Sequence, residues 1–176
     1  MLEINITTED SFDETTNKFV ATSSVAVHLE HSLAAVSKWE SIWEVPFLGK
    51  KEKTPEQTLS YVKTMVLDDN LPPEIFQKLV ENHLEEVNTY VTANMTATTI
   101  NTDPNAPASR EVVTSELIYY WMISMNIPVE FEHWHLNRLL TLVRVINLKN
   151  SPKKKMSAKE RSQLNKSRQE QYKTRG

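Results

Sequence analysis

The chain has 176 residues, of which 39% are hydrophobic, a formal net charge of −3 and no cysteine. A length of this order predicts one domain that can bury a core, and the lack of cysteine excludes disulfides, a thiol nucleophile and cysteine-ligated zinc. Only two glycines occur, so a phosphate-binding loop or a dinucleotide fingerprint is also excluded, because both are built around several glycines.

The first segment, MLEINITTEDSF, lacks the basic and apolar regions of a signal peptide. The longest apolar run, 117–123, is far shorter than the roughly 20 residues that cross a bilayer. We therefore expect a soluble protein of the cytoplasm with no membrane partner.

Two segments near the N-terminus alternate apolar and polar side chains, which is the pattern of half-buried strands. They are LEINI at 2–6 and SVAVHLE at 24–30. The segment FDETTNKFV at 12–20 is polar at its centre and suits a hairpin loop. The sequence therefore predicts a short two-stranded antiparallel ribbon.

The pattern then changes to a helical period. Ser32 can cap a helix over 33–43 that Pro46 stops. Thr54 begins a second helix, because it is followed by proline at the first helical position and by Gln57, which can complete a capping box. The residues expected to face inward from this second helix are Leu59, Val62, Met65 and Val66.

Three more helices are expected after this one. One starts at Pro72 or Pro73 and runs to about residue 91, with a break near His83. Residues 94–110 are rich in Thr, Asn and Pro and predict a long loop.

The last two expected helices form a hairpin around Pro128. The first covers 111–126 with Ser109 as its cap, and the second covers 130–147. This last helix carries apolar side chains on most of its sides, so we expect it at the centre of the domain.

These elements predict a mainly α fold with five or six helices, a short N-terminal two-stranded antiparallel ribbon and a basic C-terminal tail. Residues 151–176 hold nine Lys or Arg against two Glu, a formal charge of +7, which leaves −10 on residues 1–150. We predict an acidic helical domain over 1–150 and a flexible or helical basic tail over 151–176. This asymmetry is more typical of partner binding than of catalysis.

Catalytic and metal-binding residue types are present but do not form a recognisable pattern. On one helix, His133 and His135 would point about 200° apart and could not share a metal. His28 and Glu30 would share a strand face from which His31 points away. No serine lies in a glycine-flanked nucleophile elbow. We therefore expect no enzyme activity, metal or cofactor, and histidines that hydrogen-bond in or beside the core.

Aromatic side chains are the main candidates for partner binding. A helical core would account for most of the tryptophans, and an aromatic groove that receives a partner's helix or strand is the alternative. The basic tail adds an electrostatic contact, but its single aromatic residue, Tyr172, argues against nucleic acid as the partner. The candidate residues are Trp39, Trp43, Tyr119, Tyr120, Trp134, Lys153, Lys154 and Lys155.

Five strings carry a family resemblance: HLEHSLAAVSKWESIWEVPFL, MTATTI, SRE, TSELIYYWMISMNIPVEFEHWHLNRLLTLVRVINLKN and PKKKMS. Most of residues 27–156 resembles small proteins encoded by tailed bacteriophages, and among these the tail assembly chaperones. The resemblance implies a small, largely helical, non-catalytic protein that binds the tape measure protein and tail tube subunits during tail morphogenesis. It also implies action in the host cell cytoplasm and absence from the finished particle.

Two other functions remain open. The chain could be a virion structural protein, such as a neck, tail or baseplate component, that is retained in the particle. A small phage regulator that binds DNA or a host protein through the tail is disfavoured, because the body is acidic and no helix-turn-helix with a basic recognition helix is evident. Self-association of the chain is compatible with all three functions.

Overall fold

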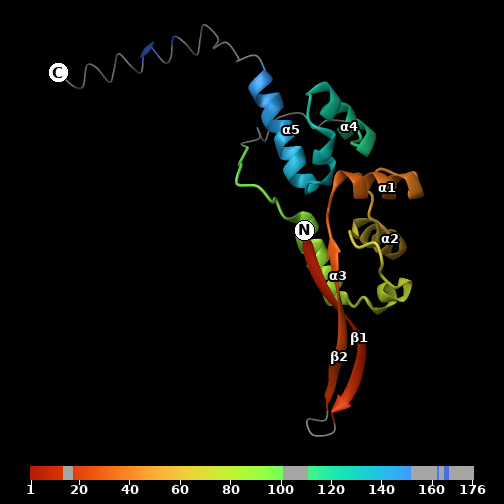
Figure 1. The fold of residues 1–176 in the computed structure, drawn as a ribbon. Coiled ribbons are helices and arrows are strands. Elements are labelled where there is room, and N and C mark those ends of the chain that lie inside the picture. Colours follow the sequence, from red (N-terminus) through yellow and green to blue (C-terminus); the bar gives the residue numbers. More distant parts are fainter. Residues whose placement is uncertain (14–17, 101–110, 152–161, 163–164, 167–176) are drawn as a thin grey trace, which may run out of the picture. The chain divides into compact units, whose positions relative to one another are not determined.

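The computed structural model describes residues 1–13, 18–100, 111–151, 162 and 165–166. The chain divides into two compact units, Met1–Ile146 and Asn147–Gly176. The described part contains five α-helices, two 3₁₀ helices and one two-stranded sheet (Figure 1). The predicted mainly α fold with an N-terminal ribbon is therefore confirmed. Most of the predicted basic tail over 151–176 lies outside the described residues.

The N-terminal ribbon is an antiparallel pair, β1 (Leu2–Asp13) and β2 (Lys18–Leu29). The predicted loop over 12–20 is wrong at both ends, because the register continues from Leu2 opposite Leu29 out to Asp13 opposite Lys18. Phe and Val favour paired strands, and the outer positions pair Phe12 with Phe19 and Ser11 with Val20. The alternation prediction is confirmed nearer the base, where one face is buried; its residues are Ile4, Ile6, Val27 and Leu29.

The first two helices begin where the capping signals place them. Helix α1 (Leu33–Trp43) is capped by Ser32, whose hydroxyl accepts the Ala35 N–H at 3.2 Å. Helix α2 (Pro55–Met65) has the predicted capping box between Thr54 and Gln57. Helix α1 ends at Trp43, shortly before Pro46, and its C-cap residue Glu44 has the left-handed conformation with φ 52°.

The next predicted helix is divided into a 3₁₀ helix, η1 (Pro73–Lys78), and helix α3 (Glu81–Thr92). The break lies at Leu79 and Val80, a few residues before the expected position at His83. The ring of His83 explains this, because its Nδ1 accepts the N–H of Val80 at 3.3 Å and so takes part in the start of α3.

The fourth helix, α4 (Ser115–Ser124), begins later than the predicted start at 111. Thr114 provides the side-chain cap, and the predicted cap Ser109 lies outside the described residues. The N–H of Ser115 donates instead to the carboxylate of Glu40 at 2.7 Å, which ties the first turn of α4 to α1. A long-range contact thus contributes to the helix start.

The predicted last helix is wrong in its first turn. A 3₁₀ helix, η2 (Val129–His133), is separated from α5 (Leu136–Asn150) by extended residues. The reason is tertiary: Ser32 and His135 form an isolated antiparallel bridge, and the Leu136 N–H donates to the His31 carbonyl at 2.7 Å. This pairing prevents the helix from continuing through position 135.

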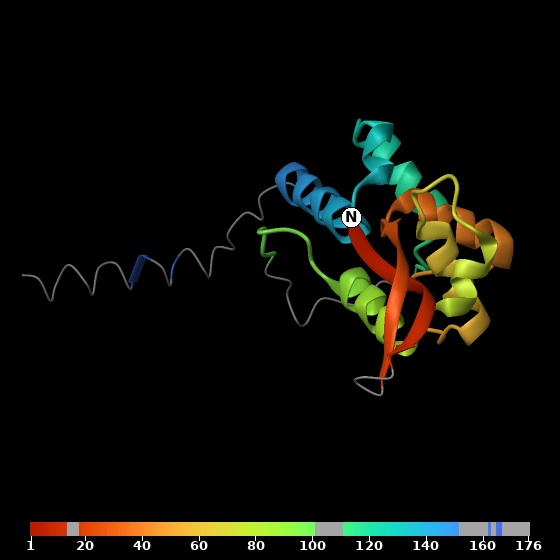
Figure 2. The same cartoon turned by 60° about the horizontal axis from the view of Figure 1, so that its bottom comes forward.

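One core connects the ribbon to the helices of the first unit. Figures 1 and 2 show α3 beside the paired strands, while α4 makes its main tertiary contacts with α1. Helix α5, which was predicted at the centre of the domain, buries Leu136, Leu139 and Val143 in this core, whereas its Leu142 and Val145 are only half-buried. The largest fully buried side chains are Trp39, Ile4, Ile6, Leu29, Leu33, Met65, Ile118, Met122, Leu136 and Leu139.

Candidate partner-binding site

The structure separates the predicted aromatic residues into two regions. Trp39 and Trp43 lie on α1 and contact α2, whereas Tyr119 and Tyr120 lie on α4. Trp134 lies between η2 and α5. The three predicted lysines Lys153, Lys154 and Lys155 lie outside the described residues.

The two tryptophans of α1 join it to α2. Trp39 is 1% exposed, and its indole N–H donates to the Gln57 carbonyl at 2.8 Å. Trp43 is half-buried and donates to the Ser60 hydroxyl at 3.0 Å. The ring of Phe47 meets Trp39 edge-on at 5.2 Å. Trp39 is therefore a core residue and has almost no surface to offer a partner.

Tyr119 and Trp134 are held at the corner between α4 and η2. The Tyr119 hydroxyl donates to a carboxylate oxygen of Glu132 at 2.6 Å, and burial together with this bond raises the pKa of Tyr119. Trp134 stacks on Phe131 at 3.9 Å, and the guanidinium of Arg138 lies 4.2 Å from the Trp134 ring. Both predicted residues are half-buried and have defined partners within the chain.

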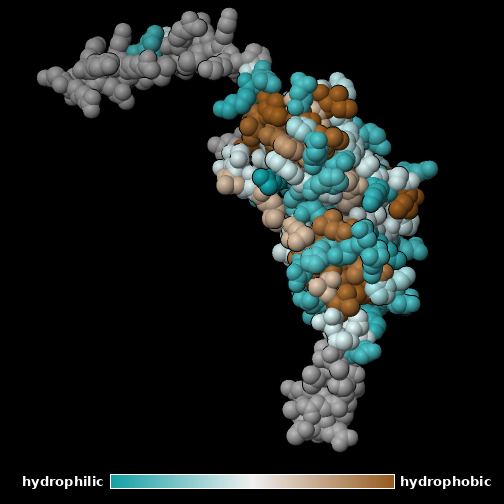
Figure 3. Space-filling model, in the orientation of Figure 1, coloured by the Kyte–Doolittle hydropathy of each residue, from teal (hydrophilic) through white to brown (hydrophobic). Residues whose placement is uncertain are grey.

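Helix α4 has an uncovered apolar face. Its residues 117–123 are seven consecutive apolar side chains, and successive side chains on a helix point about 100° apart. Burying Ile118 and Met122 therefore forces others outward, and Tyr120 is 63% and Ile123 76% exposed. We call Tyr120 and Ile123, neighbours at helical spacing, the α4 face. Figure 3 shows hydrophobic residues at the surface in the region of α4.

Two histidines, His31 and His135, are buried and lie next to each other. The rings of His31 and His135 meet edge-on at 5.0 Å. His31 Nδ1 is bonded to the Tyr61 hydroxyl at 2.5 Å, and His135 Nε2 is bonded to the Tyr90 carbonyl oxygen at 3.1 Å. Burial lowers the pKa of His31 to about 3, and it also lowers the pKa of His135. The prediction that histidines hydrogen-bond in the core is confirmed for both.

The polar network continues to the N-terminus. The Tyr90 hydroxyl donates to one carboxylate oxygen of Glu30 at 2.7 Å, and the other oxygen pairs with the Met1 ammonium at 2.8 Å. Burial and the bond to Glu30 raise the pKa of Tyr90. Within the described segments every buried side-chain nitrogen or oxygen has a hydrogen-bond partner. These hydrogen bonds therefore serve to stabilise the fold.

His28 is likewise bound within the chain. Its backbone N–H and its Nδ1 contact the carboxylate of Asp68 at 2.7 and 3.0 Å, and these bonds lower the pKa of Asp68. Across the part of the chain that the structure describes, no group of three or more His, Cys, Asp or Glu side chains could hold a metal ion.

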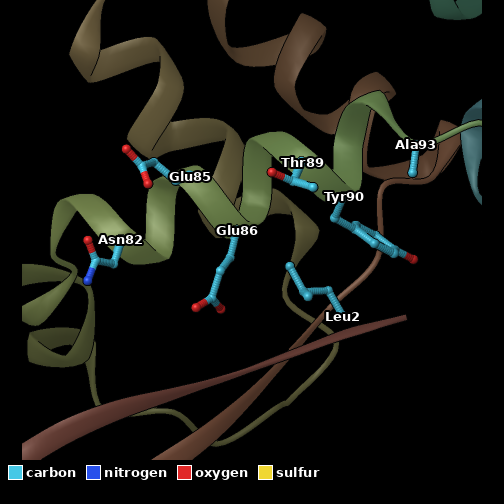
Figure 4. Close-up of a pocket in the computed structure, with 7 residues that line it drawn as sticks. All are labelled: Leu2, Asn82, Glu85, Glu86, Thr89, Tyr90 and Ala93. Carbon is cyan, nitrogen blue, oxygen red and sulfur yellow. The ribbon is translucent and has the colours of Figure 1, made fainter.

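An open depression lies between α3 and the start of β1, with a volume of about 760 Å³ (Figure 4). In Figure 4 the carboxylate of Glu86 points toward the side of α3 on which Leu2 lies, and that of Glu85 points the other way. The two acids therefore do not converge on one point, and a solvated helix face accounts for them. The lining residues are Leu2, Asn82, Glu85, Glu86, Thr89, Tyr90 and Ala93.

A smaller and more enclosed groove lies between α2 and α3, with a volume of about 220 Å³. We call it the α2–α3 groove. Sequence reasoning missed it, although the apolar spacing of Leu84, Val87 and Val91 on α3 was a visible signal that this helix faces a neighbour. The lining residues are Phe47, Lys53, Thr58, Tyr61, Val62, Leu84, Val87, Asn88 and Val91.

Comparisons with known proteins assign no family to the chain. No family model matches it, and neither a curated protein nor a solved structure shows significant similarity to it. Among the described residues, no helix combines the length and the apolar character that crossing a membrane requires.

Proposed function

We propose that the protein is a non-catalytic tail assembly chaperone of a tailed bacteriophage. In this role its α4 face takes an apolar helical segment of the tape measure protein, and the complex recruits tail tube subunits in the host cytoplasm. The family resemblance of the sequence suggests a role in phage tail assembly. The uncovered α4 face is the observation that supports partner binding.

The α4 face has the properties expected of a helix-docking surface. Exposed apolar side chains that neighbour each other are a common mark of interaction sites, and aromatic anchors such as tyrosine contribute strongly to binding. Tyr120 and Ile123 stand on a regular helix that Ile118 and Met122 anchor in the core. A helix with i, i+3, i+4 apolar spacing can pack against such a surface.

The polar neighbours of the α4 face limit what can bind. Glu116 and Ser124 lie on the same side of α4, one turn from Tyr120, and both are exposed. With about ten excess negative charges on residues 1–150, the body repels other copies of itself at close range. A partner segment with apolar residues flanked by basic ones fits this surface best.

Co-expression with the tape measure protein of the same phage tests this proposal. The wild-type chain should keep the tape measure protein in the soluble fraction and co-purify with it. The double variant Tyr120→Ser/Ile123→Ser should lose both effects while its melting temperature stays near that of the wild type. Leu67→Ser is the matched control, because Leu67 is also exposed (52%) but lies outside α4.

Two results would contradict the proposal. In the first, the double variant co-purifies with the tape measure protein as well as the wild type does. In the second, the wild-type chain neither binds the tape measure protein nor changes its solubility.

A further inference from the structure

The α2–α3 groove holds a lysine with an unusual environment. Lys53 Nζ donates to the Phe47 carbonyl oxygen at 2.8 Å and lies 4.1 Å from the centroid of the Phe47 ring. The lysine is half-buried, and burial lowers its pKa. An ammonium group has three N–H donors, and in the described part of the chain Lys53 forms no salt bridge with a carboxylate.

Burial distinguishes this cation, because Lys53 is half-buried whereas other lysines of the first unit are exposed: Lys38, Lys50, Lys51, Lys63 and Lys78. Residues 1–150 carry a formal charge of −10, and the structure shows no salt bridge between Lys53 and a described carboxylate. The two contacts with Phe47 hold its ammonium at the groove, so a carboxylate that arrives there meets a placed donor. A preorganised charge of this kind loses little side-chain entropy on binding.

The rest of the groove is apolar and small. Tyr61 and Val62 of α2 face Leu84, Val87 and Val91 of α3 across it. Its volume of about 220 Å³ is below the roughly 300–1,000 Å³ typical of small-molecule sites. A space of this size suits a single large apolar side chain.

We propose that the α2–α3 groove is a second docking site, which takes one large apolar side chain of a partner helix together with a carboxylate one turn away. The apolar side chain packs between α2 and α3, and the carboxylate pairs with Lys53. The site is separate from the α4 face and does not depend on the proposed phage function. It would let one copy of the chain hold two protein segments of different charge.

Two synthetic helical peptides test this site. Both carry one leucine in an alanine- and glutamine-based helix, and they differ only at the positions four residues before and after it, which are Glu in one and Lys in the other. Chemical shifts of the full-length ¹⁵N-labelled protein report binding at near-physiological salt, where charges beyond about 8 Å are screened. The shifts should gather at groove residues, and the Glu peptide should bind roughly five-fold more tightly.

Substitutions at Lys53 separate the charge from the apolar contact. Lys53→Gln should remove the preference between the peptides, and Lys53→Glu should reverse it. Asn88→Trp, at an exposed lining position, should block both peptides. Asn82→Trp is its control, because Asn82 is exposed on the same helix but lines the depression beside Leu2 and should leave binding unchanged.

Three outcomes would overturn the proposal. The wild-type protein could bind the Lys peptide as tightly as the Glu peptide, or neither peptide could shift the groove residues. In the third, groove signals change with protein concentration in the absence of peptide, which would assign the groove to a second copy of the chain. Thermal unfolding of each variant confirms that the fold is retained.

Discussion

The stretch 114–140 contains two regions that look alike in sequence but differ in structure. Helix α4 and the junction around His135 are both dense in aromatic or histidine side chains. At the junction, His135 is 5% exposed and bonded to the Tyr90 carbonyl oxygen. On α4, Tyr120 and Ile123 are more than half exposed.

The two regions differ in whether other residues of the same chain cover and bond their side chains. The histidine junction is closed by long-range contacts to His31 and Ser32, so it can stabilise the fold without any partner. The α4 face has no such cover within the described segments. Aromatic density alone therefore does not indicate a binding site, whereas aromatic density without an intramolecular partner does.

The largest effect on the free energy of unfolding should come from residues whose side chains are buried within the chain. Trp39→Ala removes a side chain that is 1% exposed and hydrogen-bonded to the Gln57 carbonyl. We expect the free energy of unfolding to fall by about 3–5 kcal/mol, as for other large-to-small changes in a core. Urea denaturation followed by far-UV circular dichroism measures this; a loss below about 1 kcal/mol would show that Trp39 is not central to the core.

The histidine pair should make stability depend on pH. Burial keeps His31 neutral in the folded chain down to a pKa of about 3, compared with an ordinary value of 6.5. The unfolded chain therefore takes up a proton first as pH falls, and folding stability should decrease from pH 6.5 toward pH 3, by up to about 1.4 kcal/mol per pH unit.

The variant His31→Gln isolates this contribution. Its stability should fall less steeply between pH 6.5 and 4.5 than that of the wild type, when both are measured by urea denaturation. His133→Gln is the control for a His-to-Gln change outside the core, because His133 is exposed. If the free energy of unfolding fell equally steeply with pH in the wild type and in His31→Gln, burial would not be keeping His31 neutral.

A smaller loss of stability is expected at the corner between α4 and η2. Trp134 is half-buried, stacked on Phe131 and covered by Arg138. Trp134→Ala should lower the free energy of unfolding by about 1–2 kcal/mol, since it removes one stacked pair and one cation–π contact. Side-by-side urea denaturation should rank it clearly below Trp39→Ala, and equal losses would place Trp134 in the core.

The smallest effect on the free energy of unfolding should come from substitutions on the α4 face. Tyr120→Ser and Ile123→Ser should each change the free energy of unfolding by no more than about 0.5 kcal/mol, because exposed side chains contribute little to folding. Differential scanning calorimetry checks this. A loss of several degrees in melting temperature would mean that the α4 face packs against the rest of the chain.

The sequence predicted the fold well where local signals decide the structure. The caps at Ser32 and at Thr54 with Gln57 placed α1 and α2 correctly, because a helix start is fixed by side chains within one turn. The alternation in residues 2–6 and 24–30 located the base of the ribbon for a similar reason. Helix-period and strand-period patterns need no knowledge of distant residues.

Prediction failed where distant segments decide the outcome. The last helix was expected to run through position 135, but pairing with Ser32 and His31 breaks it there. The α2–α3 groove was missed because its walls come from separate helices and its cation from a loop. Of the predicted site residues that the structure describes, Tyr120 is the most exposed, whereas Trp39 belongs to the core.

The proposal that the α4 face serves a partner only during assembly is tested most directly by mass spectrometry. Absolute amounts of this chain are measured in purified virions and in the infected-cell lysate from which they came. We expect the chain to be abundant in the lysate and absent from the particles, as for a chaperone that leaves. A fixed copy number in every virion would contradict this and identify the chain as a structural component of the particle.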